Sequence, residues 1–227
     1  MTNIRDAALL GVANDTIERY RNRYQKFGYD ARSLGWSNAE QQHYRFAQTL
    51  GASVELSGRS ILDIGCGFGD YRDFLAREAQ AIRSYQGWDV NPDLVAEATK
   101  RHAGDDRSSF AVRDFLADNL NEATKVGPVA NVGVMLGVLN FNLSGKIDNY
   151  TYSELALRRA WELVDHVLIV DFLSTLCTPD YPAESAVFYH DPVSMLKLAF
   201  SLSPHVTLKH NYCPIPQREF MLFIERR

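Results

Sequence analysis

The stretch ILDIGCGFGD, Ile61 to Asp70, places three glycines at alternate positions directly after a short apolar run that contains an aspartate. Glycine adopts positive φ angles without strain, and it has no Cβ to block a group that approaches the backbone. A turn of this composition between a strand and a helix is typical of an edge where a ligand lies against the main chain. A tight turn with nothing bound is the alternative, so the neighbouring segments have to decide between the two.

The pattern around this turn predicts a largely parallel sheet. From Ser60 onward, short β-rich runs alternate with helical segments, whereas only helical segments precede it. The last two runs are joined by CPIPQR, which leaves no room for a crossover helix, so they must pair antiparallel. The predicted strands are residues 60–64, 84–90, 108–114, 129–138, 166–172, 205–212 and 219–225. We therefore expect an α/β, Rossmann-like seven-stranded sheet with five parallel strands, a C-terminal antiparallel hairpin, helices on both faces and an N-terminal helical lid.

Helix start signals divide the chain further. Ser37 with Glu40 forms a capping box, and Asn91 is an N-cap followed by proline at the first helical position. The stretch GYDARSLGW before Ser37 reads as a loop, and residues 116–127 fit either a short helix or a loop. We expect residues 1–58 to form an N-terminal helical cap or lid, and residues 59–227 to form one compact ligand-binding domain.

Composition excludes several classes of protein. The 227 residues are 46% hydrophobic and 23% charged, which is the ordinary globular range. No signal peptide core and no apolar run of about 18 residues is present, so we expect a cytoplasmic protein without a membrane span. Three cysteines without a CxxC pair favour reduced thiols. A net charge of −4 disfavours nucleic acid as the partner, and the basic stretch 18–26 is explained by the solvated face of a helix.

Two carboxylates accompany the glycine turn. Asp89 ends the second predicted strand and Asp114 ends the third. The carboxyl ends of parallel strands meet at one edge of the sheet, where open α/β folds bind their ligands. A carboxylate there can accept hydrogen bonds from both ribose hydroxyls. The sequence therefore predicts a nucleoside-bearing ligand at this edge.

From Ser60 to Arg227 the sequence resembles the class I S-adenosylmethionine-dependent methyltransferases. LDIGCGFGD looks like the first motif of that family, GWDVNP like its second-strand acid, RDFL like its third-strand position and MLGVLNF like its fourth-strand segment. The resemblance implies S-adenosyl-L-methionine as the cofactor. The residues expected to bind it are Asp63, Gly65, Gly67, Gly69, Asp89, Val90, Asp114, Phe115, Leu136 and Gly137, together with Trp36 and Arg45 from the N-terminal segment. For Arg45 a solvated helix face is an equal alternative.

A dinucleotide site fits less well. The pyrophosphate fingerprint requires its third glycine, or an alanine, at position 70, but an aspartate stands there and the glycine is at 69. An acid at the head of the next helix would also repel a pyrophosphate, whereas a cationic sulfonium suits it. No aspartate ends the fourth strand as in the catechol-type enzymes of the family, so we expect no metal.

The methyl acceptor is less readable, because a base is needed only if the acceptor must lose a proton. The fourth-strand segment lacks the Asn/Asp-Pro-Pro-aromatic turn of the amino methyltransferases, so we expect a small-molecule substrate methylated at N or O. RNA or protein as substrate, and a non-catalytic nucleotide-binding domain, are the alternatives. His190, Tyr24 and His43 are the candidate catalytic residues, although His43 also fits a packed histidine. Further candidates for the acceptor pocket are Tyr20, Tyr44, Phe141, Asn142, Phe172 and Tyr189. His210 and Tyr212, at the end of the sixth predicted strand, are further candidate bases, and Gln41, like Arg45, is expected either to reach the carboxylate of the cofactor or to face solvent.

Overall fold

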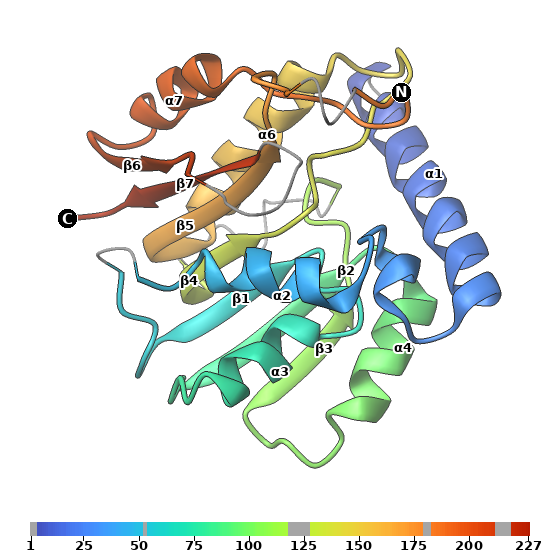
Figure 1. Cartoon of the computed structure of the whole chain (residues 1–227), viewed down its shortest axis with the longest axis vertical. Coiled ribbons are helices and arrows are strands. Elements are labelled where there is room, and N and C mark those ends of the chain that lie inside the picture. Colours follow the sequence, from blue (N-terminus) through green and yellow to red (C-terminus); the bar gives the residue numbers. More distant parts are fainter. Residues whose placement is uncertain (1–3, 52–53, 118–127, 179–182, 212–218) are drawn as a thin grey trace.

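The computed structural model describes residues 4–51, 54–117, 128–178, 183–211 and 219–227, and its sheet has the strand order β3-β2-β1-β4-β5-β7-β6 (Figure 1). The strands are β1 (Ser60–Ile64), β2 (Ser84–Asp89), β3 (Ser108–Val112), β4 (Ala130–Met135), β5 (Val164–Leu173), β6 (His205–Lys209) and β7 (Glu219–Glu225). Neighbours among β1 to β5 are parallel, and β7 pairs antiparallel with both β5 and β6. The predicted fold class is confirmed, and the strand order reverses between β1 and β4.

The helices surround this sheet. They are α1 (Ile4–Phe27), the 3₁₀ helix η1 (Ala31–Leu34), α2 (Ala39–Ala47), α3 (Asp70–Arg77), α4 (Pro92–Arg101), α6 (Asn149–Glu162) and α7 (Pro192–Phe200). Residues 118–127, which include most of the stretch that fitted either a helix or a loop, lie outside the described residues. Within the described ranges, no helix is both long enough and apolar enough to cross a membrane.

Both faces of the sheet are covered by helices because successive strand side chains point to opposite faces. In β1, Leu62 belongs to a buried cluster with Leu157 of α6 and Met195 of α7. Its neighbour Ile61 belongs to a second cluster with Phe74 of α3. Burial on both faces explains why β1 is apolar after Ser60, except for its aspartate.

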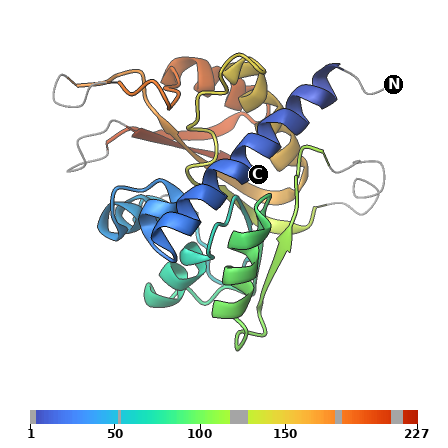
Figure 2. The same cartoon turned by 90° about the vertical axis from the view of Figure 1, so that its right-hand side faces the viewer.

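Helix α1 lies across the outside of the sheet, between α4 and the segment that follows β4 (Figures 1 and 2). On one side Arg21 forms an ion pair with Asp93 of α4, with an Nε to Oδ2 distance of 2.8 Å. On the other side Lys146 forms an ion pair with Asp15. Exposed pairs of this kind contribute little energy, but together they position α1 over the carboxyl ends of the strands.

Two predicted features of the N-terminal segment are corrected. Helix α2 is capped by Asn38 rather than Ser37, because the Asn38 side chain accepts the Gln41 N–H at 2.8 Å. The predicted loop before it contains η1, whose N-cap Asp30 accepts the Arg32 N–H at 2.9 Å. A short polar side chain two or three residues upstream starts a helical turn in both places. The predicted cap at Asn91 is confirmed.

Candidate functional site

A cavity opens at the carboxyl ends of β1 to β4, on the side where the strand order reverses. Its empty space is about 1230 Å³, part of it open to solvent, whereas pockets for small molecules commonly span about 300–1,000 Å³. It is lined by residues of α1, α2, the glycine turn, the tips of β1 to β3 and the segment after β4. The structure therefore has a cavity at the edge of the sheet where the sequence predicts a ligand.

The glycine turn has the backbone that its composition predicts. Gly65 and Gly67 have φ angles of +80° and +54°, and both line the cavity. A Cβ would lie 2.6 Å from Val138 at Gly65 and 2.8 Å from Leu34 at Gly67. Side chains from the segment after β4 and from η1 therefore approach this turn closely, so its glycines are needed for packing within the protein as well as for the approach of a ligand.

Gly69 is revised, because it does not line the cavity. It is the residue before α3 and has a φ angle of +76°. A Cβ there would lie 2.8 Å from His102 Nε2 and from the Phe110 ring. Glycine is needed at this position for the packing of α3 against α4 and β3, and not for contact with the cavity.

Asp89 is the buried carboxylate at the tip of β2 that lines the cavity. Its Oδ2 accepts the Gly67 N–H at 3.0 Å, and its Oδ1 accepts the Asn91 N–H at 2.8 Å. Burial raises the pKa of Asp89, and these two backbone donors oppose the rise. The carboxylate is thus fixed in orientation, and its oxygens keep lone pairs for a further donor. The neighbouring Val90 also lines the cavity.

The tip of β3 supplies a second fixed carboxylate. Asp114 lines the cavity and accepts the N–H groups of Leu116 at 3.0 Å and Ala117 at 3.2 Å. Phe115 is 6% exposed and lines the cavity as well. An apolar ring beside a carboxylate suits a planar nucleobase, whose ring can pack on the phenyl group and whose exocyclic amine can donate to the carboxylate.

Asp63, at the tip of β1, also lines the cavity and accepts a hydrogen bond from the Tyr85 hydroxyl. Burial raises the pKa of Asp63 to about 7, and this hydrogen bond opposes the rise. A carboxyl of this kind would change its charge readily when a cation came close.

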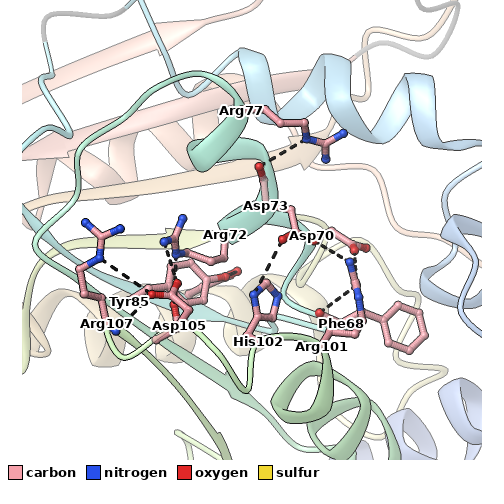
Figure 3. Close-up of polar contacts among 12 residues, drawn as sticks. Phe68, Asp70, Arg72, Asp73, Arg77, Tyr85, Arg101, His102, Asp105 and Arg107 are labelled. Carbon is pink, nitrogen blue, oxygen red and sulfur yellow. Dashed lines mark hydrogen bonds and ion pairs between the residues drawn. The ribbon is translucent and has the colours of Figure 1, made fainter.

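Sequence reasoning missed Asp70 and Gln42 as residues that line the cavity. Asp70 begins α3 and accepts from Tyr29 at 2.9 Å, from Arg101 at 2.7 Å and from Gln42 at 3.2 Å. Figure 3 shows that Arg101 of α4 also points toward Asp73. Its Nη2 donates to Asp73 Oδ2 at 2.5 Å. The acid at the end of the glycine motif was a usable signal for Asp70, whereas no local pattern marks Gln42.

Leu136, Gly137 and Trp36 form the wall above β4, and all three line the cavity. Gly137 has a φ angle of +78°, and a Cβ on it would lie 3.0 Å from the Trp36 ring. On its other side the Gly137 N–H donates to Asp171 at 2.6 Å. Trp36 therefore packs against the fourth-strand segment and lines the cavity, and its contact with a cofactor stays a prediction.

Arg45 is revised, because it does not line the cavity. It is buried and forms an ion pair with Glu219 at the start of β7, with Nε 2.6 Å from Oε2. Its guanidinium also lies 4.9 Å from the centroid of the Trp36 ring. The charge that the sequence assigned either to a cofactor carboxylate or to solvent instead holds α2 on the sheet.

The candidate catalytic residues His43 and Tyr24 lie outside the cavity. The His43 ring contacts Arg77, with Nε2 2.8 Å from Nη2, and it packs beside Phe74. The Tyr24 hydroxyl donates to Glu97 of α4 at 3.2 Å. Both side chains join helices to one another, so neither is retained as a catalytic candidate.

His190 is also removed from the site. It is fully buried at 0% exposure, its Nε2 lies 2.9 Å from Ser153 Oγ, and the rings of Phe172 and Phe188 pack against it. Burial lowers the pKa of His190 to about 4. The side chain is an uncharged core residue between β5 and α6.

Of the remaining candidate residues, Tyr20 and Phe141 line the cavity, with their ring centroids 5.7 Å apart. Tyr212 lies outside the described residues. The candidates that do not line the cavity are Gln41, Tyr44, Asn142, Phe172, Tyr189 and His210. Among the described residues, no group of three or more His, Cys, Asp or Glu side chains could hold a metal ion.

Solved structures share this architecture. The structure is similar to magnesium protoporphyrin IX methyltransferase from Synechocystis PCC 6803 with bound S-adenosylhomocysteine, with a TM-score of 0.62, 17% identity and coverage of 95% of this chain and 100% of that one. It is also similar to the N-methyltransferase NodS from Bradyrhizobium japonicum WM9 in complex with S-adenosylhomocysteine, with a TM-score of 0.60, 15% identity and coverage of 92% and 98%.

The small RNA methyltransferase HEN1 is similar as well, with a TM-score of 0.56 and 16% identity, but the match covers 83% of this chain and 25% of that one. No family model and no curated protein matches the sequence. At these identities the likeness shows a shared fold, the Rossmann-like fold of methyltransferases.

Proposed function

We propose that the chain is an enzyme that binds S-adenosyl-L-methionine in this cavity and transfers its methyl group to a small molecule. The observation that carries the proposal is the pair of oriented carboxylates, Asp89 and Asp114, which line one cavity with the glycine turn between β1 and α3. Two solved structures of the same fold hold S-adenosylhomocysteine. That cofactor would explain why the cavity combines carboxylates with apolar walls.

The residues present fit such a cofactor. The acidic and basic side chains of the described cavity lining are four aspartates and Arg113. An acidic surround favours a cation over a pyrophosphate. Asp89 would accept hydrogen bonds from ribose hydroxyls, and Asp114 with Phe115 would bind the adenine. Asp63 and Asp70 would lie beside the charged methionine portion.

When bound, S-adenosylmethionine supplies a methyl group on a sulfonium that a nucleophile can displace in line. The protein has to align the acceptor with that carbon and keep water out, effects that can supply much of the rate. Leu34 and Val138 close over the glycine turn, and Trp36 closes over Gly137. These side chains would exclude water from the transfer.

A small molecule is the proposed acceptor because α1 covers the cavity and its basic residues already have partners within the protein. Arg21 forms an ion pair with Asp93, Arg23 donates to the Arg32 carbonyl, and the Arg19 guanidinium lies 3.9 Å from the Phe141 ring centroid. An RNA substrate, as in the name of one structural neighbour, would require these cations to face phosphates. Strong salt-sensitive binding of RNA would favour that alternative.

The test is a calorimetric titration of S-adenosylmethionine and S-adenosylhomocysteine into the wild type, Asp89→Asn and Asp106→Asn. Asp89→Asn replaces one acceptor oxygen by a donor, so we expect affinity to fall by about 1.5–3 kcal/mol, the value of a hydrogen bond to a charged group. The exposed Asp106 is the matched control and should leave affinity unchanged. Equal affinity in all three proteins, or no binding to the wild type, would refute the assignment of the site.

A further inference from the structure

Beneath the N-terminal half of α1 the cavity is lined by a mostly apolar set of side chains, which we call the slot. Leu9, Val12, Ala13 and Thr16 line it from α1, and their spacing puts them on one helical face. Leu139 and Phe141 of the segment after β4 line the same cavity. Among these six side chains only that of Thr16 is polar, and its hydroxyl donates to the Val12 carbonyl at 2.8 Å. The slot therefore offers van der Waals contact and almost no polar contact.

The cations next to the slot belong to the attachment of α1. Lys146 forms an ion pair with Asp15 and lies 3.4 Å from the Gly11 carbonyl oxygen. Arg19 stacks on Phe141. Neither Lys146 nor Arg19 lines the cavity, so an anionic group in the slot would find no positive partner among the described residues of α1 or of the segment after β4.

Apart from its four aspartates, the described part of the cavity wall has no side chain suited to remove a proton from an acceptor in the slot. It contains no histidine, lysine or glutamate. Burial raises the pKa values of Cys66, Tyr20, Tyr71 and Tyr152, so these groups keep their protons at neutral pH. The aspartates lie at the tips of β1 to β3 and at the start of α3, on the side proposed for the cofactor, and each accepts from a protein donor.

We propose that the slot selects an apolar, uncharged acceptor. Its nucleophile is a nitrogen whose lone pair is free at neutral pH, as in an arylamine or a heteroaromatic ring. This proposal rests on the function proposed above. The nitrogen lone pair forms the N–CH₃ bond while the S–CH₃ bond breaks, and its electron pair stays on sulfur to give S-adenosylhomocysteine. Any extra proton on the product nitrogen leaves to water, so no protein base takes part.

Other acceptor classes conflict with the same residues. A hydroxyl is a weak nucleophile until a base removes its proton, and the slot has none. A carboxylate or phosphate would lose its hydration shell in the slot, because the side chains that define the slot include no cation. Arg113, the cation that lines the described part of the cavity, follows β3 next to Asp114, on the side proposed for the cofactor. Both acceptor classes would bind or react worse than a nitrogen compound of the same shape.

The test uses three isosteric probes, naphthylamine, naphthol and naphthoate, each substituted at the same ring carbon, with the full-length protein. Binding is measured with the protein saturated by S-adenosylhomocysteine, and methyl transfer with S-adenosylmethionine. We expect naphthylamine to bind at least about tenfold more tightly than naphthoate, because the carboxylate is desolvated without a partner. We expect naphthylamine to be methylated on nitrogen and naphthol to be bound without being methylated.

Ala13→Trp tests the place of the slot, because the new ring would fill it, and Asn14→Trp is the control on the exposed side of the same helix. We expect Ala13→Trp to abolish naphthylamine binding and Asn14→Trp to preserve it, with equal affinity for S-adenosylhomocysteine in all proteins. No S-adenosylhomocysteine binding by the wild type would refute the proposed function itself. With that binding intact, the slot proposal is overturned if naphthylamine does not bind or is not methylated, if naphthoate binds as tightly, if naphthol is methylated as fast, or if Ala13→Trp binds naphthylamine normally.

Discussion

The buried ion pair between Arg45 and Glu219 holds α2 and Trp36 against the sheet, and its rupture has a cost that can be worked out. The two side chains are 4% and 1% exposed. Removing one partner of such a pair costs about 3–5 kcal/mol, because the other charge stays buried without compensation. Burial raises the pKa of Glu219, and Arg45 opposes that rise. Arg45→Met removes the opposition, so Glu219 will take up a proton more easily in the folded state.

We therefore expect Arg45→Met to lower the free energy of unfolding by about 3–5 kcal/mol at about pH 8, and by less at about pH 5. The sign follows from the raised folded-state pKa of Glu219: stability is present while the group is protonated and is lost as pH rises. Urea unfolding followed by circular dichroism at both pH values measures the loss. The double variant Arg45→Met, Glu219→Leu removes both charges and should lie within about 1 kcal/mol of the wild type.

A loss below about 1 kcal/mol for Arg45→Met at the higher pH, the value of an exposed pair, would refute this account of how the N-terminal segment is held. A double variant no more stable than the single one would refute it as well, because the cost would then lie in lost packing of the arginine side chain rather than in an unpaired carboxylate.

Two further substitutions test residues on either side of the cavity. Burial raises the pKa of Asp171 from 3.8 to about 7, so its contribution to stability is complete below pH 3.8 and is lost as pH rises through about 7. Asp171→Asn keeps an oxygen for the Gly137 N–H and should make the melting temperature in thermal scans depend less on pH between those two values. An unchanged dependence of the melting temperature on pH would contradict the assignment. At Gly69, where φ is +76° and His102 and Phe110 lie close, alanine should cost about 1–3 kcal/mol in urea unfolding. Calorimetry should find its affinity for S-adenosylhomocysteine unchanged, and a large loss of affinity would return Gly69 to the site.

The sheet and the carboxylates were predictable because the signals for them are local. Asp89 and Asp114 end two consecutive strands, and parallel strands bring such ends to one edge whatever the rest of the chain does. Arg45 was not predictable, because its partner Glu219 lies 174 residues away in the sequence. His190 failed for a related reason: its position beside a helix cap suggested a loop, whereas the surrounding aromatic rings bury it.

The wall over β4 explains why motifs reveal one half of the cavity and not the other. Asp171 of β5 binds the Gly137 N–H from one side, and Trp36 packs on Gly137 from the other. Arg45 stacks on Trp36 and reaches Glu219 of β7. This wall exists only where four distant parts of the chain meet, so no run of consecutive residues encodes it. The slot beneath α1 is built in the same way, from a helix that carries no motif and from the segment after β4. The half of the cavity that follows a pattern is the half proposed for a cofactor that many proteins share, whereas the half that chooses the acceptor is specified only by tertiary packing.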